Sequence, residues 1–523
     1  MSRRIVGTLV LAATGIAALP AVAQSFRVQC PTSTITHPTA AANNSEPAYS
    51  AATTLTPGAN GYLVPSGHVN GAIKCQQISG GDGYATMGDG TQTYMFSFGP
   101  LSGLSDIANG LPGTEFPTVF NTLYAGALPL RPGDPATTGL PSFSFNGAVG
   151  LTPDIDANAG AGTVGAAVDG HVDPRPIMDV GVMNGNIPAP MMAIDEDDEF
   201  FLTLTNVGMI MRPDLFEQHT VHFHGYPNAS SFYDGVPDAS VAINIGGSFT
   251  YYYLAPDAGT YFWHCHITPP EHLQMGMVGQ IYVRPRQNRV AAGASLHAAL
   301  MAQQGDLRTA CNSATDILCT NPVPLTDNGA TRAASGKYAY NDGDGSTYYD
   351  VEYPIQIHGF DPNFHFVGMT FNPEGFADMK DKYFLLNGRS YPDTVTSGPM
   401  ETVSADGLNH FSQPLPSIIN IPAGQKALLR ISDLDVTEYQ TLASLGIPMK
   451  VIGYNAKLLR DQSGNNLFYT TNSITLGGGE SLDVILDTTG VPTGTYYLYT
   501  PNLDHLSNDA ENFGGLMTEV HVN

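Results

Sequence analysis

Short runs of alternating or β-branched residues, separated by Gly, Pro, Asn and Asp, dominate the chain from about residue 173 onward. The sequence EFFLTLTN at 199–206 is one such run, and two more follow at 248–254 and 259–266. Because strands alternate their buried side chains and end at turn-forming residues, this pattern predicts a β-sandwich. A second strand-rich block extends over residues 348–523.

The second block repeats landmarks of the first in the same order. The sequence GTYY at 494–497 corresponds to GTYF at 259–262. An internal repeat of this kind indicates two copies of one fold. The copies differ in chemistry, because YTP at 499–501 takes the place of HCH at 264–266.

The chain before residue 173 lacks this regular pattern. Residues 1–23 combine paired arginines, an apolar core and a terminal Ala-Val-Ala, which predicts an export signal cleaved near Ala23. Residues 24–172 are turn-rich and weakly periodic, with short possible strands such as residues 93–98, so we expect an irregular extension that wraps a later domain and carries no chemistry. We expect the polar stretch at 286–347 to link two domains, whose predicted boundaries are 173–285 and 348–523.

Charge and hydropathy narrow the choice of partners. The chain has 47 acidic against 21 basic residues, a formal net charge of −26. A nucleic acid is attracted by Lys and Arg, so this balance disfavours nucleic-acid binding and suits cationic partners. No later apolar run is long enough for a transmembrane segment. Together with the export signal, this predicts a periplasmic or secreted protein.

Six of the fifteen histidines and one of the five cysteines lie in two short segments, HTVHFHG at 219–225 and GTYFWHCHITPPEHLQMGMVGQIYV at 259–283. Successive side chains of a strand point to opposite faces. Cys265 therefore points to the opposite face from His264 and His266. In the upstream segment, His219 points to the opposite face from His222 and His224. We call the first group the thiolate set and the second the imidazole set. The thiolate set is His219, Cys265, His272 and Met277, and the imidazole set is His222, His224, His264 and His266.

The two sets predict two copper sites with different roles. A thiolate, two imidazoles and a weak methionine sulfur form the ligand environment of a type 1 (blue) copper site. The four imidazoles predict a second copper site of type 2 or type 3 on the opposite face. Because His264 and His266 flank Cys265, about one peptide bond separates the ligands of the two sites. This proximity suits short electron transfer.

If Cys265 is a metal ligand, four cysteines remain. In an oxidising compartment we expect Cys30 to pair with Cys75 and Cys311 with Cys319.

These motifs resemble the multicopper oxidase family of the cupredoxin superfamily. The resemblance is close over residues 173–283 and weak over 348–523, and it does not cover the first 150 residues. It implies an all-β fold of tandem Greek-key β-sandwich (cupredoxin) domains, two-domain type, with type 1 copper in the first. Copper-containing nitrite reductases resemble the chain less, since the resemblance implies that they carry an acid at position 222 and no histidine at 266. The family motifs are H-x-x-H-x-H-G at 219–225, D-G-V-P at 234–237, S-F-T-Y at 248–251 and H-C-H-I…H…G-M at 264–277.

The resemblance implies an exported copper-dependent oxidoreductase. It would take single electrons at the type 1 copper from a small molecule, a metal ion or a redox protein, and pass them to the second copper site and dioxygen. Two-domain members assemble as trimers with the second site between subunits, so a homo-oligomer is implied.

The chain departs from the family pattern in two ways. The loop ITPPE between His266 and His272 is longer than in laccase-like members. A full trinuclear cluster in the family takes eight histidines from two domains, and only four are visible here. The second block has isolated histidines, which we expect in the core or on the surface: His358, His365, His410 and His505.

Two alternatives therefore stay open. One is a blue-copper electron-transfer or metal-handling protein with an incomplete second site. The other is a structural exported β protein whose ligands are vestigial.

Overall fold

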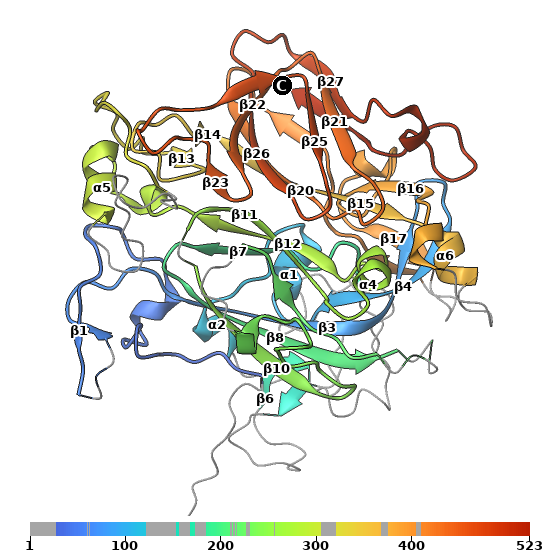
Figure 1. Cartoon of the computed structure of the whole chain (residues 1–523), viewed down its shortest axis with the longest axis horizontal. Helices are drawn as coiled ribbons and strands as arrows, with labels where there is room; N and C mark the ends of the chain where they lie inside the picture. Colours follow the sequence, from blue (N-terminus) through green and yellow to red (C-terminus); the bar gives the residue numbers. More distant parts are fainter. Residues whose placement is uncertain are drawn as a thin grey trace, which may run out of the picture.

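The computed structural model describes most of the chain (Figure 1). The predicted export signal, the Cys311 and Cys319 pair and much of 24–172 lie outside the described residues. No helix in the described part of the chain is long and apolar enough to cross a membrane. The structure describes residues 28–59, 61, 63–121, 153–155, 168–172, 185–209, 212, 215, 217–225, 231–255, 257–304, 321–367, 375–403 and 409–523.

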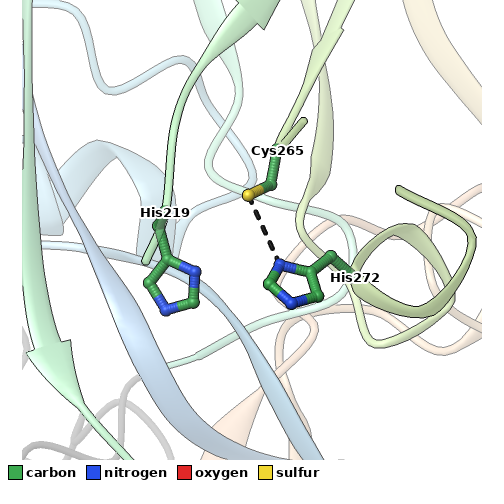
Figure 2. A group of neighbouring side chains, drawn as sticks. All are labelled: His219, Cys265 and His272. Atoms are coloured by element: carbon green, nitrogen blue, oxygen red, sulfur yellow. Dashed lines mark hydrogen bonds between the residues drawn. The ribbon is translucent and has the colours of Figure 1, made fainter. Parts of the chain in front are cut away.

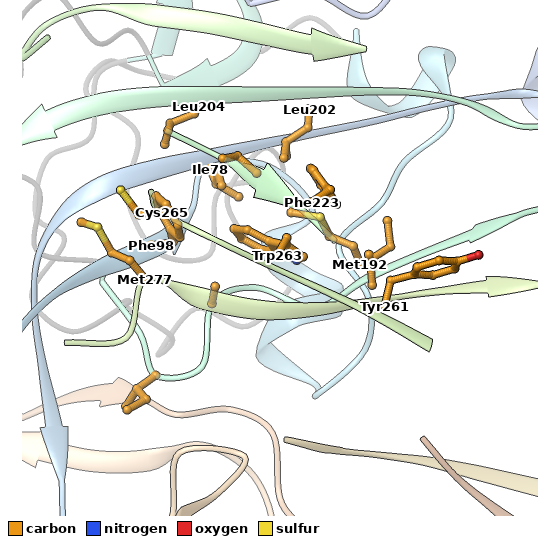
Figure 3. Close-up of a cluster of buried hydrophobic side chains, with 14 of the residues drawn as sticks. Ile78, Phe98, Met192, Leu202, Leu204, Phe223, Tyr261, Trp263, Cys265 and Met277 are labelled. Carbon is orange, nitrogen blue, oxygen red and sulfur yellow. The ribbon is translucent and has the colours of Figure 1, made fainter. Parts of the chain in front are cut away.

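The first sandwich consists of two four-stranded sheets, and the expected all-β class is confirmed. The facing sides of the sheets bury one hydrophobic cluster, in which Leu202 and Leu204 of one sheet meet Trp263 of the other (Figure 3). One sheet has the order β10-β8-β3-β4 and the other β7-β12-β11-β9. Their bounds are β3 Ile73–Thr86, β4 Gln92–Pro100, β7 Met192–Asp195, β8 Glu199–Gly208, β9 His222–Phe223, β10 Ser248–Leu254, β11 Gly259–His264 and β12 Val278–Arg284.

Residues 73–100 differ from the expected irregular extension, because they form β3 and β4 of the first sandwich. β3 runs parallel to β8, from Ile73 opposite Glu199 to Gly81 opposite Gly208, and pairs antiparallel with β4. The first sandwich therefore takes two of its strands from the segment expected only to wrap around it. The predicted boundary at residue 173 lies outside the described residues.

The glycines of β3 explain why its sequence resembles a turn. An added Cβ at Gly81 would lie 2.4 Å from the side chain of Val207, and one at Gly83 would lie 2.2 Å from the carbonyl oxygen of Gly185. β3 therefore needs glycine at these positions, because its neighbours approach its backbone too closely for a side chain.

The second sandwich has a seven-stranded and a five-stranded sheet, in the upper part of Figure 1. The larger has the order β16-β15-β20-β26-β22-β23, with β24 also paired to β22, and the smaller has the order β19-β28-β27-β21-β25. Between them lies a second core cluster that includes Leu429, Val484 and Leu498. The bounds are β15 Val351–Phe360, β16 Tyr383–Leu386, β19 Ile419–Ile421, β20 Lys426–Asp433, β21 Gln440–Leu445, β22 Met449–Tyr454, β23 Lys457–Leu458, β24 Tyr469–Thr471, β25 Ser473–Leu476, β26 Ser481–Asp487, β27 Gly494–Tyr499 and β28 Met517–Val522.

Strand pairing supports the internal repeat. In the first sandwich β7 is parallel to β12, which is antiparallel to β11; in the second, β19 is parallel to β28, which is antiparallel to β27. The other sheets also correspond, because β4-β3-β8-β10 has the same sequence of directions as β16-β15-β20-β26. By this correspondence β3 and β4 are the counterparts of β15 and β16.

The interface between the sandwiches combines apolar contacts, such as that of Phe262 and Leu273 with Leu434, with buried polar bonds. β11 lies against β20 and β26, and the hydroxyl of Thr260 donates to the carboxylate of Asp483 at 2.6 Å. The side-chain amide of Gln280 donates to the carbonyl oxygen of Arg430 at 3.0 Å and to the hydroxyl of Ser432 at 2.9 Å. These directional bonds fix how the two sandwiches meet.

Short elements connect and flank the sheets. The helices are α1 Leu104–Ala108, α2 Pro117–Phe120, α4 Pro269–Gln274, α5 Leu296–Gln303 and α6 Pro362–Val367. The remaining strands form small hairpins: β1 Leu55–Pro57 with β2 Leu63–Pro65, β5 Pro153–Ile155 with β6 Val168–Val172, β13 Lys337–Tyr338 with β14 Tyr348–Tyr349, and β17 Met400–Val403 with β18 Asn409–Ser412.

The predicted disulfide between Cys30 and Cys75 is confirmed, and it ties the N-terminal segment to β3. Replacing both cysteines with Ala is expected to lower the free energy of unfolding by about 2–5 kcal/mol, because the cross-link restricts the unfolded chain. The two cysteines are 45 residues apart in sequence. Denaturant titration measures the loss, with reduced wild-type protein as the control. Equal stability of the double variant and the oxidised wild type would contradict this role.

Candidate metal centres

The pairing of β9 with β11 brings the two histidine-rich segments together. His222 is the register partner of His264, and Phe223 is that of Trp263. Upstream of β9, His219 is held by two backbone hydrogen bonds with Ile243, at 3.1 and 2.9 Å. The conformation of both segments is therefore fixed by backbone bonds.

The thiolate set converges in the core of the first sandwich. The ligand atoms of His219, Cys265 and His272 all lie within 4.8 Å of one another, and all three residues are fully buried. Figure 2 shows the two rings beside the sulfur, with Nδ1 of His272 at 3.4 Å from Sγ of Cys265. Met277 is buried in the same cluster as Cys265 (Figure 3).

Backbone bonds close the segment that carries these residues. The amide of Cys265 donates to the carbonyl oxygen of Met277 at 3.0 Å, and the amide of Met277 donates to that of His272 at 2.9 Å. The five-residue loop ITPPE includes the start of α4, whose two prolines occupy its first positions. The fixed backbone angle of proline suits the first turn of a helix. The longer loop between His266 and His272 is therefore ordered by the start of α4.

The buried polar atoms of this site fit a metal ion. Among the described residues, neither ring nitrogen of His219 has a hydrogen-bond partner. Burying a polar nitrogen without a partner is costly, and a coordinated metal removes that cost. A thiolate with two imidazoles is a soft donor set that suits copper.

The electrostatics of the site favour a cation. Burial lowers the pKa of His219 well below its usual range, which keeps the imidazole neutral and able to ligate. Burial would also lower the pKa of His272, but its interactions with Cys265 and with the nearby carboxylate of Glu217 raise it to about 9. The amide of Thr220 donates to Sγ of Cys265 at 3.5 Å, which stabilises a thiolate.

Two residues of the thiolate site's surroundings come from the segment at 73–100, where sequence analysis found no chemistry. A Cβ at Gly80 would lie 2.6 Å from the ring of His219, so only glycine fits there. The ring of Phe96 lies edge-on to His272, with centroids 5.3 Å apart. The glycines of β3 were the only sequence signal of this contact.

The imidazole set gathers on the other face of the strand pair. The ligand atoms of His222, His224 and His264 lie within 4.8 Å of one another, and the ring centroid of His266 is 5.2 Å from that of His222. The alternation of side chains along the sequence thus predicts the face of the strand pair on which these four histidines lie.

Hydrogen bonds to carbonyl oxygens orient the rings of this set. Nδ1 of His222 donates to the carbonyl oxygen of Asp234 at 2.6 Å, and Nδ1 of His264 to that of Cys265 at 2.7 Å. Each bond leaves Nε2 with a lone pair, as in the outer-shell arrangement of metal-binding histidines. Burial lowers the pKa of His224 to about 4 and that of His264 to about 3, so both rings are neutral ligands near pH 7.

The imidazole set borders a cleft of about 580 Å³ between the two sandwiches. His224 and His264 lie on one wall, and residues 434–439 and 477–480 of the second sandwich form the other. The described residues of that second wall include Asp435, Glu438 and Glu480 but no histidine. The described part of the second sandwich therefore faces the imidazole set with carboxylates.

The described side chains of the isolated histidines have other partners. His358 and His365 are buried and bind Gln274, and His505 is buried between Gln440 and Glu438. The side chain of His410 lies outside the described residues. Placement of the first three in the core agrees with their isolated spacing.

The region around both sets is similar in sequence to known copper proteins. Residues 168–288 match the family model described as multicopper oxidase. A laccase of Aspergillus fumigatus is 34% identical over 109 residues, which cover 20% of this chain and 17% of the relative. A copper-containing nitrite reductase of Neorhizobium galegae is 35% identical over 106 residues, covering 20% of this chain and 25% of the relative.

Among solved structures, the blue copper oxidase from Nitrosomonas europaea superposes with a TM-score of 0.42 at 20% identity, covering 65% of this chain and 78% of that one. The match to the laccase and the reductase spans a quarter or less of each relative's length. Residues 168–288, which carry the thiolate set and the imidazole set, thus match the multicopper oxidase family, whose members bind copper, including type 1 copper.

Loading with copper is expected to give the intense blue absorption of a copper–thiolate site, and Cys265→Ser is expected to abolish it, because a hydroxyl oxygen cannot replace the soft thiolate. Visible absorption and electron paramagnetic resonance of the copper-loaded proteins measure this. Thr220→Ser, which keeps the backbone amide facing Sγ, is the control and should stay blue. A blue Cys265→Ser variant would contradict the site.

Proposed function

We propose that this protein is an exported copper-dependent oxidoreductase of the multicopper oxidase type. It takes single electrons at a type 1 copper held by the thiolate set and passes them to copper at the imidazole set and on to dioxygen. The observation that carries the proposal is the buried convergence of His219, Cys265 and His272, in which no described residue bonds either ring nitrogen of His219. Copper bound there supplies one-electron redox chemistry.

The chain provides a short connection between the two sites. His264 and His266 are covalent neighbours of Cys265, and Nδ1 of His264 also donates a hydrogen bond to the carbonyl oxygen of Cys265. The thiolate and the imidazole set are therefore linked through one residue's backbone. This link supports the proposed path of electrons between the two sites.

The proposed entry for electrons is the edge of His272 that faces Glu217. Oε2 of Glu217 lies 3.7 Å from Nε2 of His272, and the Glu217 side chain is 30% exposed. The nearby imidazole of His272 holds the pKa of Glu217 below its usual range, so Glu217 is a carboxylate near pH 7. A carboxylate here suits a small cationic molecule, a metal ion or a positively charged redox protein as donor.

Export is supported by the disulfide between Cys30 and Cys75, because such bonds persist in oxidising compartments. The proposed location is the periplasm or the exterior of the cell. The proposed quaternary structure is a homo-oligomer, which would bring further ligands to the imidazole set.

The second candidate function is a blue-copper electron-transfer or metal-handling protein. It is favoured by the cleft, because the described wall opposite His224 and His264 offers carboxylates and no imidazole. Four histidines hold fewer coppers than the eight of a full trinuclear cluster. Under this candidate the thiolate set keeps its role, and dioxygen is not reduced.

Metal analysis combined with dioxygen uptake separates the two functions. For the oxidase we expect three or more coppers per chain and oxygen consumption with a small reductant, and we expect Cys265→Ser to lose turnover while it keeps the copper of the imidazole set. His521→Gln is the matched histidine control, because His521 is far from both sets in the sequence and its ring is hydrogen-bonded to Glu519. One blue copper per chain without oxygen consumption would contradict the oxidase and support the electron carrier.

A further inference from the structure

Helix α4, which carries His272, ends in a buried glutamine that enters the second sandwich. Oε1 of Gln274 accepts hydrogen bonds from the backbone amide of Asp361 at 3.1 Å and from Nε2 of His365 at 3.0 Å. Its amide nitrogen donates to Oδ1 of Asp381 at 2.5 Å. The whole side-chain amide is thus bound by the other sandwich.

The backbone of the same residue is held as well. Nε2 of His358 donates to the carbonyl oxygen of Gln274 at 3.1 Å. We call His358, Asp361, His365 and Asp381 the Gln274 socket. All four residues of the socket are buried.

The chemistry of the socket allows only one arrangement of donors and acceptors. A backbone amide can only donate, so the bond from Asp361 fixes which end of the glutamine is oxygen. In the described part of the chain, Nδ1 of both His358 and His365 has no partner, so each ring is neutral and donates through Nε2. Burial lowers the pKa of His365 to about 3, in agreement with a neutral ring.

The socket is itself anchored in the second sandwich. The hydroxyl of Thr437 donates to Asp381 and, at 2.9 Å, to Asp435. Thr437 and Asp435 also line the cleft at the imidazole set. The socket is therefore a fixed part of the second sandwich.

His272 precedes Gln274 by two residues on the same short helix. Its Nδ1 lies 3.4 Å from Sγ of Cys265, and the helix has only six residues. Holding the last residue of so short a helix restrains the position and tilt of the ring. Groups that orient a metal ligand affect metal affinity and electronic properties without touching the metal.

We propose that Gln274 and its socket are a positioning device for His272, through which the second sandwich sets the geometry of the thiolate site without ligating metal. The inference rests on the proposed copper site at the thiolate set. It does not depend on dioxygen reduction. It gives His358 and His365 a function that is not metal binding.

The main test compares two buried glutamines. Gln274→Met keeps the side-chain volume and loses the bonds to the socket. Copper affinity of the thiolate site is expected to fall about 10- to 100-fold, with a shift of the blue absorption band and of the reduction potential. Gln280→Met is the matched control, since Gln280 also bonds the second sandwich but lies on β12. It should keep the wild-type band and potential.

A variant in the second sandwich guards against general misfolding. His365→Phe keeps the stacking on Phe360, whose ring centroid is 5.3 Å away, but loses the bond to Gln274. The expected result is a band shift in the same direction as for Gln274→Met, with an unchanged copper count.

Two results would overturn the proposal. One is an unaltered band and potential in both Gln274→Met and His365→Phe. The other is the loss of one copper per chain in His365→Phe, which would make His365 a ligand. Absence of oxygen uptake by the wild type would overturn the oxidase function alone and leave these spectroscopic results standing.

Discussion

The alternation of side chains along one pair of strands is the constraint on which both candidate metal sites depend. Because β11 pairs with β9, with His264 opposite His222, the residues on each side of this ribbon are fixed by the backbone. Cys265 is directed into the core, where burial excludes water from the thiolate. His264 is directed to the cleft, where the metal of the imidazole set would be accessible to small molecules. A shift of one residue in this register would exchange the two environments, since a strand has a side-chain period of two.

The same local rule explains how much could be predicted from the sequence. The alternation of side chains along a strand involves only a few residues, so HTVHFHG and GTYFWHCH were enough to sort the candidate ligands into two groups. The fold class also followed from local patterns. What could not be predicted is non-local: β3 and β4 are separated from β8 by a long segment, and glycines replace the expected apolar residues. Gly80 is required by the ring of His219, a contact that the sequence of β3 alone does not reveal.

The second sandwich shows how a repeat that lacks ligands still contributes to a metal site. At the positions of the ligands it has Tyr499, Thr500 and Pro501, so the copy of the metal site itself is absent. Its polar side chains instead bond to the first sandwich, through Asp483 to Thr260 and through Asp381 to Gln274. Such bonds are directional and therefore specify one relative placement of the two sandwiches. A hydrophobic interface of equal area would restrain that placement less.

Histidines without a metal-binding spacing illustrate the value of counting hydrogen bonds. Counted over the residues that the structure describes, His358 and His365 each have one bonded and one unpaired ring nitrogen, while both nitrogens of His219 are unpaired. In a neutral imidazole, one hydrogen bond satisfies the N–H group. The other ring nitrogen then has only an unused lone pair, whose burial costs less free energy. Two unpaired nitrogens leave a buried donor without any acceptor, which is the more costly condition. The difference separates a histidine that supports a neighbouring segment of the same chain from one whose burial makes sense only with a ligand.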